Sequence, residues 1–334
     1  MRSVLAVRFD STLRSWWRAL TWFVDSVGLW TVLAVAAQMA LGTWVWPLPF
    51  VLHFFEASAC VWVAGFAISL ALRSKSRLLL HGSLLLAWSI HCGPQVVRAF
   101  AAEPARVAGE LRVLTLNAGA GCATPSRLVR ALRDSDVDVV FLQDLAAENA
   151  RALEHAPDLP FAHRALFPLG IAGKGLLARF PLREVRLVSN DDGSNRLHAI
   201  LETPSGDVTL VDIHANARVP FLGRWIGFDE QIAALAGGLL SAQLAIVAGD
   251  FNLPSTSPIL KPLAAAGFRD AFDEVGVGLG LSFPVFSRYR DAPLPPLVRI
   301  DHVWVRGLEC VDARLGEDAG SDHMPLRVRL VVQR

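Results

Sequence analysis

Asp250 and Asn252 lie two residues apart at the end of an apolar run that begins at Leu244. Leu244–Val247 is typical of a short buried strand, and Gly249 lets the chain turn after it. Because side chains two apart on extended backbone share a face, a carboxylate and a carboxamide are expected side by side where the sheet meets solvent. Such a pair can orient a water, a phosphate oxygen or a metal-bound ligand. The same residues also suit a plain turn, so the pair indicates a site only if other polar residues join it.

Further Asp, Asn and His residues stand beside the ends of predicted strands or in short loops: Asn117, Asp144, His214, Asp301, Asp322 and His323. A set of this kind without a cysteine cluster suits a hard divalent cation, chiefly Mg²⁺ or Mn²⁺, rather than structural zinc. Each residue alone also has a structural alternative. Asn117 and Asp322 suit turns, and Asp144 suits the cap of the helix that follows it. His214 suits a hydrogen-bonded position in the core.

Strands and helices alternate after residue 110, which predicts an α/β domain. The expected strands are 111–116, 137–142, 171–180, 197–203, 208–213, 244–247, 299–305 and 326–332. The expected helices are 126–133, 146–155, 221–240 and 255–266. Most of the candidate polar residues follow one of these strands directly, so the strand ends are expected to position them.

The composition divides the chain into an apolar part and an ordinary one. Hydrophobic residues make up 53% of the 334 residues, and eight of the ten Trp lie before residue 100. We therefore expect a membrane domain over residues 1–100, a linker over 101–110 and a single globular domain over 111–334. The net charge of +1 provides no global basic field for nucleic acid, although it does not exclude a nuclease. Whether Cys122 and Cys310 pair stays open.

Three apolar stretches, 27–46, 51–72 and 78–97, are each close to the roughly 20 residues that a membrane-spanning helix needs. A cleaved signal peptide fits poorly, because two further apolar runs follow the first. Arginines precede the first stretch, the loop at 47–49 has no basic residue, and the loop at 73–77 has three. The positive-inside rule then predicts an integral protein of the cytoplasmic membrane whose C-terminal domain lies on the extracytoplasmic side. The rival interpretation is a soluble helical bundle.

Six short motifs, taken in order, resemble the motif series of the endonuclease/exonuclease/phosphatase superfamily: Leu116-Asn117, Phe141–Asp144, Asp212–His214, Gly249–Asn252, Ile300–His302 and Ser321–Pro325. That family includes deoxyribonuclease-like enzymes, abasic-site endonucleases, neutral sphingomyelinases and inositol polyphosphate phosphatases. The resemblance covers roughly residues 111–332. It implies a four-layer α/β sandwich with two packed mixed β-sheets, here preceded by the three predicted transmembrane helices.

The resemblance also implies the metal-binding residues. Asp144 stands where the family has its metal-binding glutamate, Asn117 would help to hold metal or phosphate, and Asp322 would support the metal site. The chain departs from the family pattern at Asp144, because aspartate is one methylene shorter than glutamate. Since Mg²⁺ tolerates little error in ligand distance, a closer backbone, a bridging water or a weaker metal site would have to follow.

The remaining roles implied by the resemblance are catalytic. Asp250 would orient or deprotonate the attacking water, and Asn252 would position that water and the phosphate. Asp301 would pair with His323 and fix its tautomer, while His214 would contact the phosphate or assist the leaving group. The expected reaction is one in-line attack of water on phosphorus, with the accumulating charge offset by the metal and the histidines.

These roles predict a membrane-anchored, divalent-metal-dependent phosphodiesterase or phosphohydrolase. The lipid bilayer and a phosphoester, either a phospholipid headgroup or a nucleic acid, are the expected partners, and no obligate protein partner is indicated. The competing hypothesis is a catalytically lapsed domain that serves as a membrane-tethered binding module. Retention of the Asp301 and His323 motifs favours the enzyme, whereas the shorter Asp144 favours the module.

Overall fold

The computed structural model describes residues 11–41, 52–189, 195–215, 228–285 and 295–332. The chain divides into two compact units, Met1–Cys92 and Gly93–Arg334. The N-terminal unit contains α1 (Ser11–Leu41) and α3 (Ala59–Ala71), and α4 (Lys75–Arg98) runs from it into the second unit.

The prediction of three membrane-spanning helices is wrong for the described residues. One helix, Ser15–Ala37, is long and apolar enough to cross a membrane, by length and composition alone. α3 has 13 residues and reaches about 20 Å, short of the roughly 30 Å hydrocarbon core. α4 has 24 residues, but His81, His91 and Gln95 lower its hydropathy. The end of the first predicted span and the loop at 47–49 lie outside the described residues. A single apolar helix near the N-terminus is compatible with a signal sequence as well as with an anchor.

The second unit contains two mixed six-stranded sheets, as expected. In spatial order the first comprises β11 (Leu308–Leu315), β12 (Leu326–Val332), β1 (Leu111–Asn117), β2 (Val139–Gln143), β4 (Lys174–Ala178) and β3 (His163–Phe167). The second comprises β5 (Leu182–Ser189), β6 (Asn195–Thr203), β7 (Gly206–His214), β8 (Ala245–Asp250), β10 (Asp301–Arg306) and β9 (Arg269–Asp270). The β1–β2 and β7–β8 pairs are parallel, and the other pairs are antiparallel.

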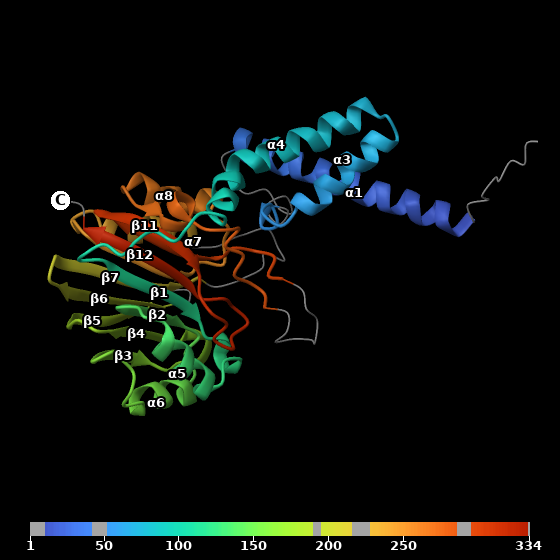
Figure 1. Ribbon diagram of the computed structural model, residues 1–334. Helices are drawn as coiled ribbons and strands as arrows, with labels where there is room; N and C mark the ends of the chain where they lie inside the picture. The colour runs from blue at the N-terminus through green and yellow to red at the C-terminus, as the bar shows by residue number, and fades with distance from the viewer. Residues whose placement is uncertain (1–10, 42–51, 190–194, 216–227, 286–294, 333–334) are drawn as a thin grey trace, which may run out of the picture. The chain divides into compact units, whose positions relative to one another are not determined.

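The main core lies between the two sheets, whose strands Figure 1 shows, and its buried side chains come from both of them. Val113 and Phe141 from the first sheet pack there with Leu210 and Ile246 from the second. The opposite face of the first sheet is buried too, because α5 (Pro125–Asp134) and α6 (Ala147–His155) cover it. This double burial explains why β2 is a continuous apolar run and why β1 becomes mostly apolar after Arg112.

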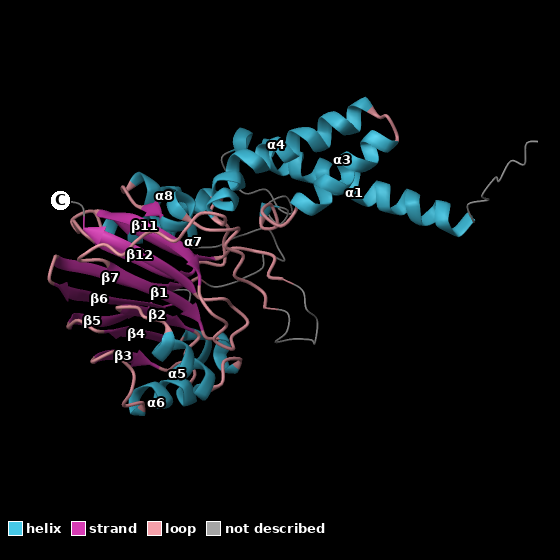
Figure 2. Cartoon of the chain, viewed as in Figure 1, coloured by secondary structure: helices cyan, strands magenta, loops and turns pink. Residues whose placement is uncertain are grey.

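Figure 2 shows the sheets of this unit with their flanking helices. The remaining helices are α7 (Phe228–Gly238), α8 (Lys261–Ala265) and α9 (Ala271–Val275). The helix predicted over 255–266 is confirmed in part, because the 3₁₀ turn η3 (Pro258–Leu260) leads directly into α8 and together they cover 258–265. The first part of the helix predicted over 221–240 lies outside the described residues. Cys122 and Cys310, whose pairing was open, are not joined by a disulfide.

Candidate active site

Two rows of polar residues, one on each sheet, form the site. In the second sheet Asp250 at the end of β8 is paired in register with His214 of β7 and with Asp301 of β10. In the first sheet Asn117 of β1 is paired with Gln143 of β2, which is itself opposite Lys174 of β4. The sheets therefore bring six polar residues to one end of the sandwich.

Gly249 makes this alignment possible. The sequence predicts a turn at this glycine, but β8 continues through it to Asp250. Gly249 has φ +144°, and a Cβ there would overlap the carbonyl oxygen of Ile213 on β7. Only glycine permits this close approach of two parallel strands, and the approach sets Asp250 beside His214.

The Asp250 carboxylate lies at the centre of the site and is almost fully buried. Its Oδ2 accepts a hydrogen bond from Asn117 Nδ2 at 2.9 Å, which joins the two sheets, and its Oδ1 accepts one from the Asn252 backbone N–H at 2.8 Å. Burial raises the pKa of Asp250, and the charges of His323 and His214 partly oppose that rise. The carboxylate is thus more basic than an exposed aspartate and is held in one orientation.

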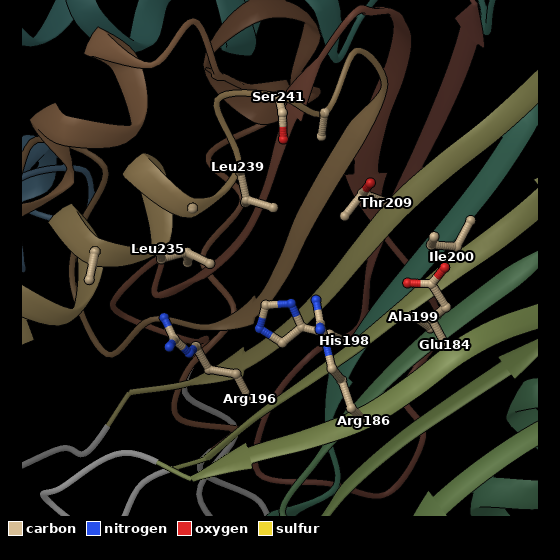
Figure 3. A pocket seen from close by; sticks show the side chains of 13 residues that line it. Glu184, Arg186, Arg196, His198, Ala199, Ile200, Thr209, Leu235, Leu239 and Ser241 are labelled. Carbon is tan, nitrogen blue, oxygen red and sulfur yellow. The ribbon is translucent and has the colours of Figure 1, made fainter.

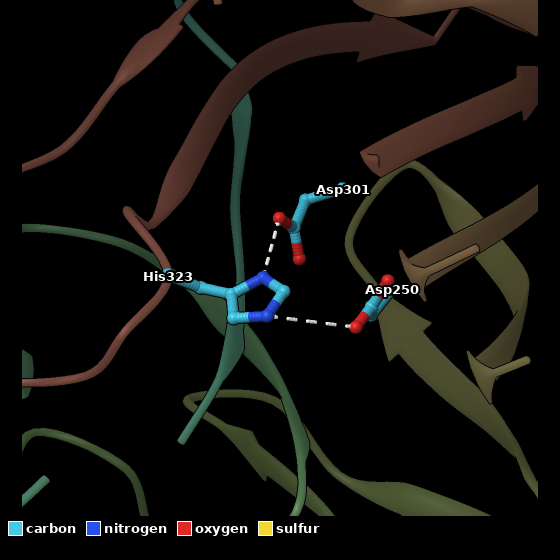
Figure 4. Close-up of side chains that lie close together, drawn as sticks. All are labelled: Asp250, Asp301 and His323. Carbon is cyan, nitrogen blue, oxygen red and sulfur yellow. Dashed lines mark hydrogen bonds and ion pairs between the residues drawn. The ribbon is translucent and has the colours of Figure 1, made fainter. Parts of the chain in front are cut away.

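His323 and Asp301 form the predicted pair. His323 Nδ1 donates to Asp301 Oδ2 at 2.9 Å, and its Nε2 lies 3.7 Å from Asp250 Oδ2 (Figure 4). Burial lowers the pKa of His323, but the charges of Asp301 and Asp250 and the hydrogen bond to Asp301 outweigh it and raise the pKa to about 9. The ring is therefore an imidazolium at neutral pH, oriented by one carboxylate toward another.

His214 and Asp144 repeat this arrangement on the other side of Asp250. His214 Nδ1 lies 2.7 Å from Asp144 Oδ1, and its Nε2 lies 3.5 Å from Asp250 Oδ2. The close contact between His214 and Asp144 is an ion pair without an aligned hydrogen bond, since Asp144 Oδ1 has no hydrogen-bond partner among the described residues. Burial lowers the pKa of His214, but this contact and the Asp250 charge raise it overall.

Asp144 does not cap the helix that follows it. The residue before the first turn of α6 is Ala146, and no side chain caps that turn. Asp144 instead adopts φ +52°, in the left-handed region that Asp tolerates better than most residues. This conformation accompanies a carboxylate that faces His214.

Asn252 and Asp322 are placed less directly. The Asn252 side chain donates to the carbonyl oxygen of Ala215 at 2.7 Å, so it braces the loop after β7, while its backbone holds Asp250. Asp322 lies beside β1, where Ser321 Oγ is 2.6 Å from the Asn117 carbonyl oxygen and 3.2 Å from Asp322 Oδ1. Both predicted residues therefore border the site.

A buried lysine beside this centre was missed by sequence reasoning. Lys174 is 1% exposed, and burial lowers its pKa against the opposing charges of Asp212, Asp144 and Asp250. Asp212 is fully buried and accepts from Gln143 Nε2 at 2.7 Å. Burial raises the pKa of Asp212 to about 8, and the charge of Lys174 opposes the rise. One signal was available: Lys174 stands beside an uninterrupted apolar strand, where an unpaired lysine is rare.

The residues fit a divalent cation. Asp250, Asp301 and His323 each offer a ligand atom, and these atoms lie within 4.8 Å of one another. Asp301 Oδ1 is a buried oxygen without a hydrogen-bond partner among the described residues, whereas Asp144 Oδ1 already has the ion-pair contact with His214. Buried carboxylate oxygens without donors are costly unless a cation compensates them. This group differs from the predicted ligands Asp144, Asn117 and Asp322, although Asn117 and Asp144 both contact the same centre.

Comparison with known proteins agrees with this geometry. The family model described as "Endonuclease/Exonuclease/phosphatase family" matches residues 114–323, which is more than half of the chain. The chain belongs to the endonuclease/exonuclease/phosphatase family. It is a phosphoesterase of that family. None of the curated proteins compared with the chain matches it.

Several solved structures share the fold of this phosphoesterase at low identity. An endonuclease/exonuclease/phosphatase from Bacteroides vulgatus is 16% identical, with a TM-score of 0.54 over 67% of this chain and 99% of that one. The 3'-5' exonuclease NExo from Neisseria meningitidis is 18% identical, with a TM-score of 0.51 over 66% and 100%. D. rerio TDP2 complexed with a single-strand DNA product is 17% identical, with a TM-score of 0.50 over 66% and 98%.

Proposed function

We propose that this phosphoesterase is a divalent-metal-dependent phosphodiesterase in which Asp250 activates the attacking water. The observation that carries this proposal is the position of Asp250 between two histidines whose Nδ1 atoms each contact an aspartate, His323 by a hydrogen bond to Asp301 and His214 by an ion pair with Asp144. One base flanked by two oriented cations matches what in-line attack on a phosphodiester requires.

In this mechanism Asp250 Oδ2 accepts the proton of the water whose oxygen attacks phosphorus. The raised pKa of Asp250 favours that transfer, and Asn117 and the Asn252 backbone keep the carboxylate still. The bond from phosphorus to the leaving oxygen breaks as the new bond forms. His214 lies against the same carboxylate and donates to the phosphate or to the leaving oxygen.

His323 stabilises the charge that gathers on the phosphoryl oxygens. Asp301 fixes the ring so that Nδ1 keeps its proton and the Nε2–H points into the site. A donor that is already oriented needs no reorganisation as the charge develops, which is the origin of its effect on rate.

Mg²⁺ or Mn²⁺ is the proposed cofactor, because carboxylate and amide oxygens are the ligands these ions prefer. Asp144 and Asn117, with Asp322 nearby, would hold it, and Asp250 and Asp301 form a second set of oxygens that could contribute. A bound divalent ion would neutralise part of the negative charge of the substrate phosphate. His323 is the weakest candidate ligand, since its Nδ1 is committed to Asp301.

A nucleic-acid strand is the proposed substrate. Two proteins that share the fold support this choice, namely the TDP2 bound to a single-strand DNA product and the 3'-5' exonuclease. A phospholipid headgroup is the second candidate, and the observation that favours it is the apolar helix Ser15–Ala37, which could hold the enzyme at a bilayer.

The test is turnover by the full-length, detergent-solubilised protein on single-stranded DNA, phospholipids and phosphomonoesters. We expect Mg²⁺-dependent release of nucleotides from DNA that is lost in EDTA and in His323→Ala. A matched histidine substitution at an exposed helix position, His155→Ala, should leave turnover unchanged. Lipid hydrolysis without DNA hydrolysis would transfer the assignment to the second substrate. Metal-independent turnover would contradict the proposed cofactor.

The proposed location is the extracytoplasmic side of the cytoplasmic membrane. With one span in place of three the expected side does not change, because basic residues still precede the helix and an odd number of spans follows them. A reporter that is active only outside the cytoplasm, fused after Arg334, should be active. Activity of a cytoplasm-only reporter at the same position would contradict this location.

A further inference from the structure

A cavity of about 350 Å³ lies on the outer face of the second sheet. Its floor is formed by β5, β6 and β7, and Leu235 of α7 and Leu239, which follows that helix, form one wall (Figure 3). The catalytic residues do not line it. A volume of this size is within the range of sites that hold small molecules.

The floor of this cavity carries cations where a covered sheet face is usually apolar. Along β6 the side chains of Leu197 and Ala199 enter the core between the sheets, so Arg196 and His198 point to the outer face. Arg186 of β5 is directly opposite His198 in the ladder and lies on the same face. Like charges directly opposite each other destabilise a sheet, so this arrangement has a cost in the unliganded protein.

The cost is reduced in part because His198 is neutral. Burial lowers the pKa of His198 to about 4, and the charges of Arg196 and Arg186 add to the decrease. Among the described residues no carboxylate lies within ion-pair distance of Arg186 or Arg196, whereas Arg183, earlier on β5, pairs with Glu202 and Asp207. Within the described part of the chain, neither arginine at the cavity therefore has a compensating carboxylate.

Two donors at the cavity are also buried without partners. Arg196 Nε and His198 Nε2 have no hydrogen-bond partner among the described residues, and neither is reached by solvent. Burying such groups without partners costs free energy, and an acceptor in the cavity would offset that cost once the two side chains turn toward it. Glu184 is the one acidic residue among the described residues lining the cavity, and it forms no ion pair with either arginine. Both arginines are therefore available to a ligand.

We propose that this cavity binds a small molecule carrying a phosphoryl group, with Arg186, Arg196 and His198 around the phosphoryl oxygens. Two arginines suit a phosphoryl group better than they suit an anion with a single charge. The reason is that each guanidinium offers several N–H groups in one plane, which match the several oxygens of the phosphoryl group. Thr209 and Ser241 add hydroxyl donors, and Leu235 and Leu239 provide an apolar surface for the rest of the molecule. This site is separate from the catalytic one and does not depend on the proposed substrate.

The probe is phenylphosphonate, whose carbon–phosphorus bond is not a phosphoester, and inorganic phosphate serves as the comparison. Binding is measured by titration calorimetry on the full-length protein in detergent, with EDTA present so that no metal recruits either anion to the catalytic site. We expect phenylphosphonate to bind more tightly than phosphate because of the leucine wall. Arg196→Gln and Arg186→Gln should each weaken phenylphosphonate binding about tenfold.

Three variants distinguish this site from general charge effects and from the catalytic site. Arg183→Gln removes the same charge from the same strand outside the cavity and should not change binding. His323→Gln alters the catalytic site and should not change it either. Leu239→Trp fills the cavity while keeping both arginines and should abolish binding, provided that its circular dichroism spectrum is unchanged.

The proposal is overturned by any of three results. These are no phenylphosphonate binding up to about 10 mM, an equal loss in Arg183→Gln and Arg196→Gln, or a loss that follows His323→Gln instead of the cavity variants. None of these results depends on the enzyme's turnover. If the cavity does not bind the probe, the proposed function is unaffected. If the proposed function is wrong, the binding measurement at the cavity is unaffected.

Discussion

β10 carries two neighbouring residues that take part in two Asp–His pairs with different surroundings. Asp301 holds His323 Nδ1 at 2.9 Å, and the next residue, His302, points to the other face and contacts Asp270 through its own Nδ1 at 2.7 Å. The two pairs have the same chemical groups and nearly the same geometry. What differs is the group that each second ring nitrogen faces.

His302 Nε2 lies 2.8 Å from the carbonyl oxygen of Leu253, and the ring is completely buried. Asp270 also accepts from the backbone N–H of Phe272 and lies beside Arg299. Burial raises the pKa of Asp270, but Arg299 and His302 outweigh it and lower the pKa to about 2. Every group of this pair is occupied within the protein, so the pair is structural.

His323 Nε2 faces Asp250 at 3.7 Å, which is too long for a hydrogen bond. The gap leaves the N–H available to a third group, and the substrate phosphate is the proposed one. The presence of an Asp–His pair therefore does not by itself distinguish a catalytic role from a structural one. The group that the second ring nitrogen faces makes the distinction.

The largest expected effect comes from breaking the catalytic pair. His323→Ala and Asp301→Ala should each lower kcat by about 10²–10⁴-fold, the range of one positioned proton donor. The double variant should lose little more, because the two residues act as a unit. Turnover of all three proteins on the substrate identified above checks this. Losses that multiply would show two independent residues, and full activity of the double variant would remove the catalytic assignment.

Breaking the structural pair should change stability and leave the chemistry intact. Asp270→Asn removes the charge that compensates Arg299 and His302, and breaking a buried ion pair costs about 3–5 kcal/mol of unfolding free energy. Urea unfolding of this unit measures the loss. The activity per folded molecule should stay close to wild type. A large fall in kcat without a fall in stability would assign Asp270 and His302 to catalysis instead.

The sequence predicted the catalytic pair but not the structural one, and the reason is physical. His323 and Asp301 lie in recognisable motifs, whereas Asp270 precedes a short helix and Arg299 was expected only as the start of a strand. Their meeting depends on the β9–β10 register, and β9 has two residues, too few for a periodic pattern.

The same limit explains the other differences from the predictions. The strands predicted correctly are apolar runs such as β1, β2 and β8, which burial makes visible. β5 was missed because its side chains are mostly exposed and three of its eight residues are charged, so neither alternation nor an apolar run marks it. Lys174 was missed because its neighbours Asp212 and Asp250 reach it from the other sheet. Contacts between the sheets are set by how the sheets pack, and a local sequence pattern does not predict that packing.

The pH dependence of turnover should separate the two pairs further. The imidazolium of His323 has a pKa of about 9, so kcat should fall above about pH 9 as its proton is lost. Asp301→Asn removes one of the charges that raise this pKa and should move the alkaline limb to lower pH, while Asp270→Asn should leave it in place. The folded pKa lies above the ordinary 6.5, so the stability that His323 contributes is complete below about pH 6.5 and lost as the pH rises through about 9. An alkaline limb that both variants leave unmoved would exclude His323 as its source.

The smallest expected effect concerns the third pair, His214 with Asp144. In this pair the aspartate has two candidate roles, to orient the histidine or to bind the metal. If Asp144 only orients His214, as Asp301 orients His323, then Asp144→Ala should lower kcat and leave the Mg²⁺ requirement unchanged. If Asp144 is a metal ligand, then Asp144→Ala should raise the Mg²⁺ concentration for half-maximal activity by about 10-fold or more.

Asp144→Glu is the more informative variant at this position. Glutamate adds the methylene that the family pattern has, so it should preserve turnover or lower the Mg²⁺ requirement about threefold, the direction that relief of a strained ligand distance predicts. Asp158→Ala, at a surface ion pair with Arg133, is the matched control and should leave the Mg²⁺ titration unchanged. The measurement is activity against free Mg²⁺ for the four proteins. A requirement that neither Asp144 variant alters would remove Asp144 from the metal site. The aspartate would then be a positioning residue for His214, and Asp250 and Asp301 would be the carboxylates left to hold the ion.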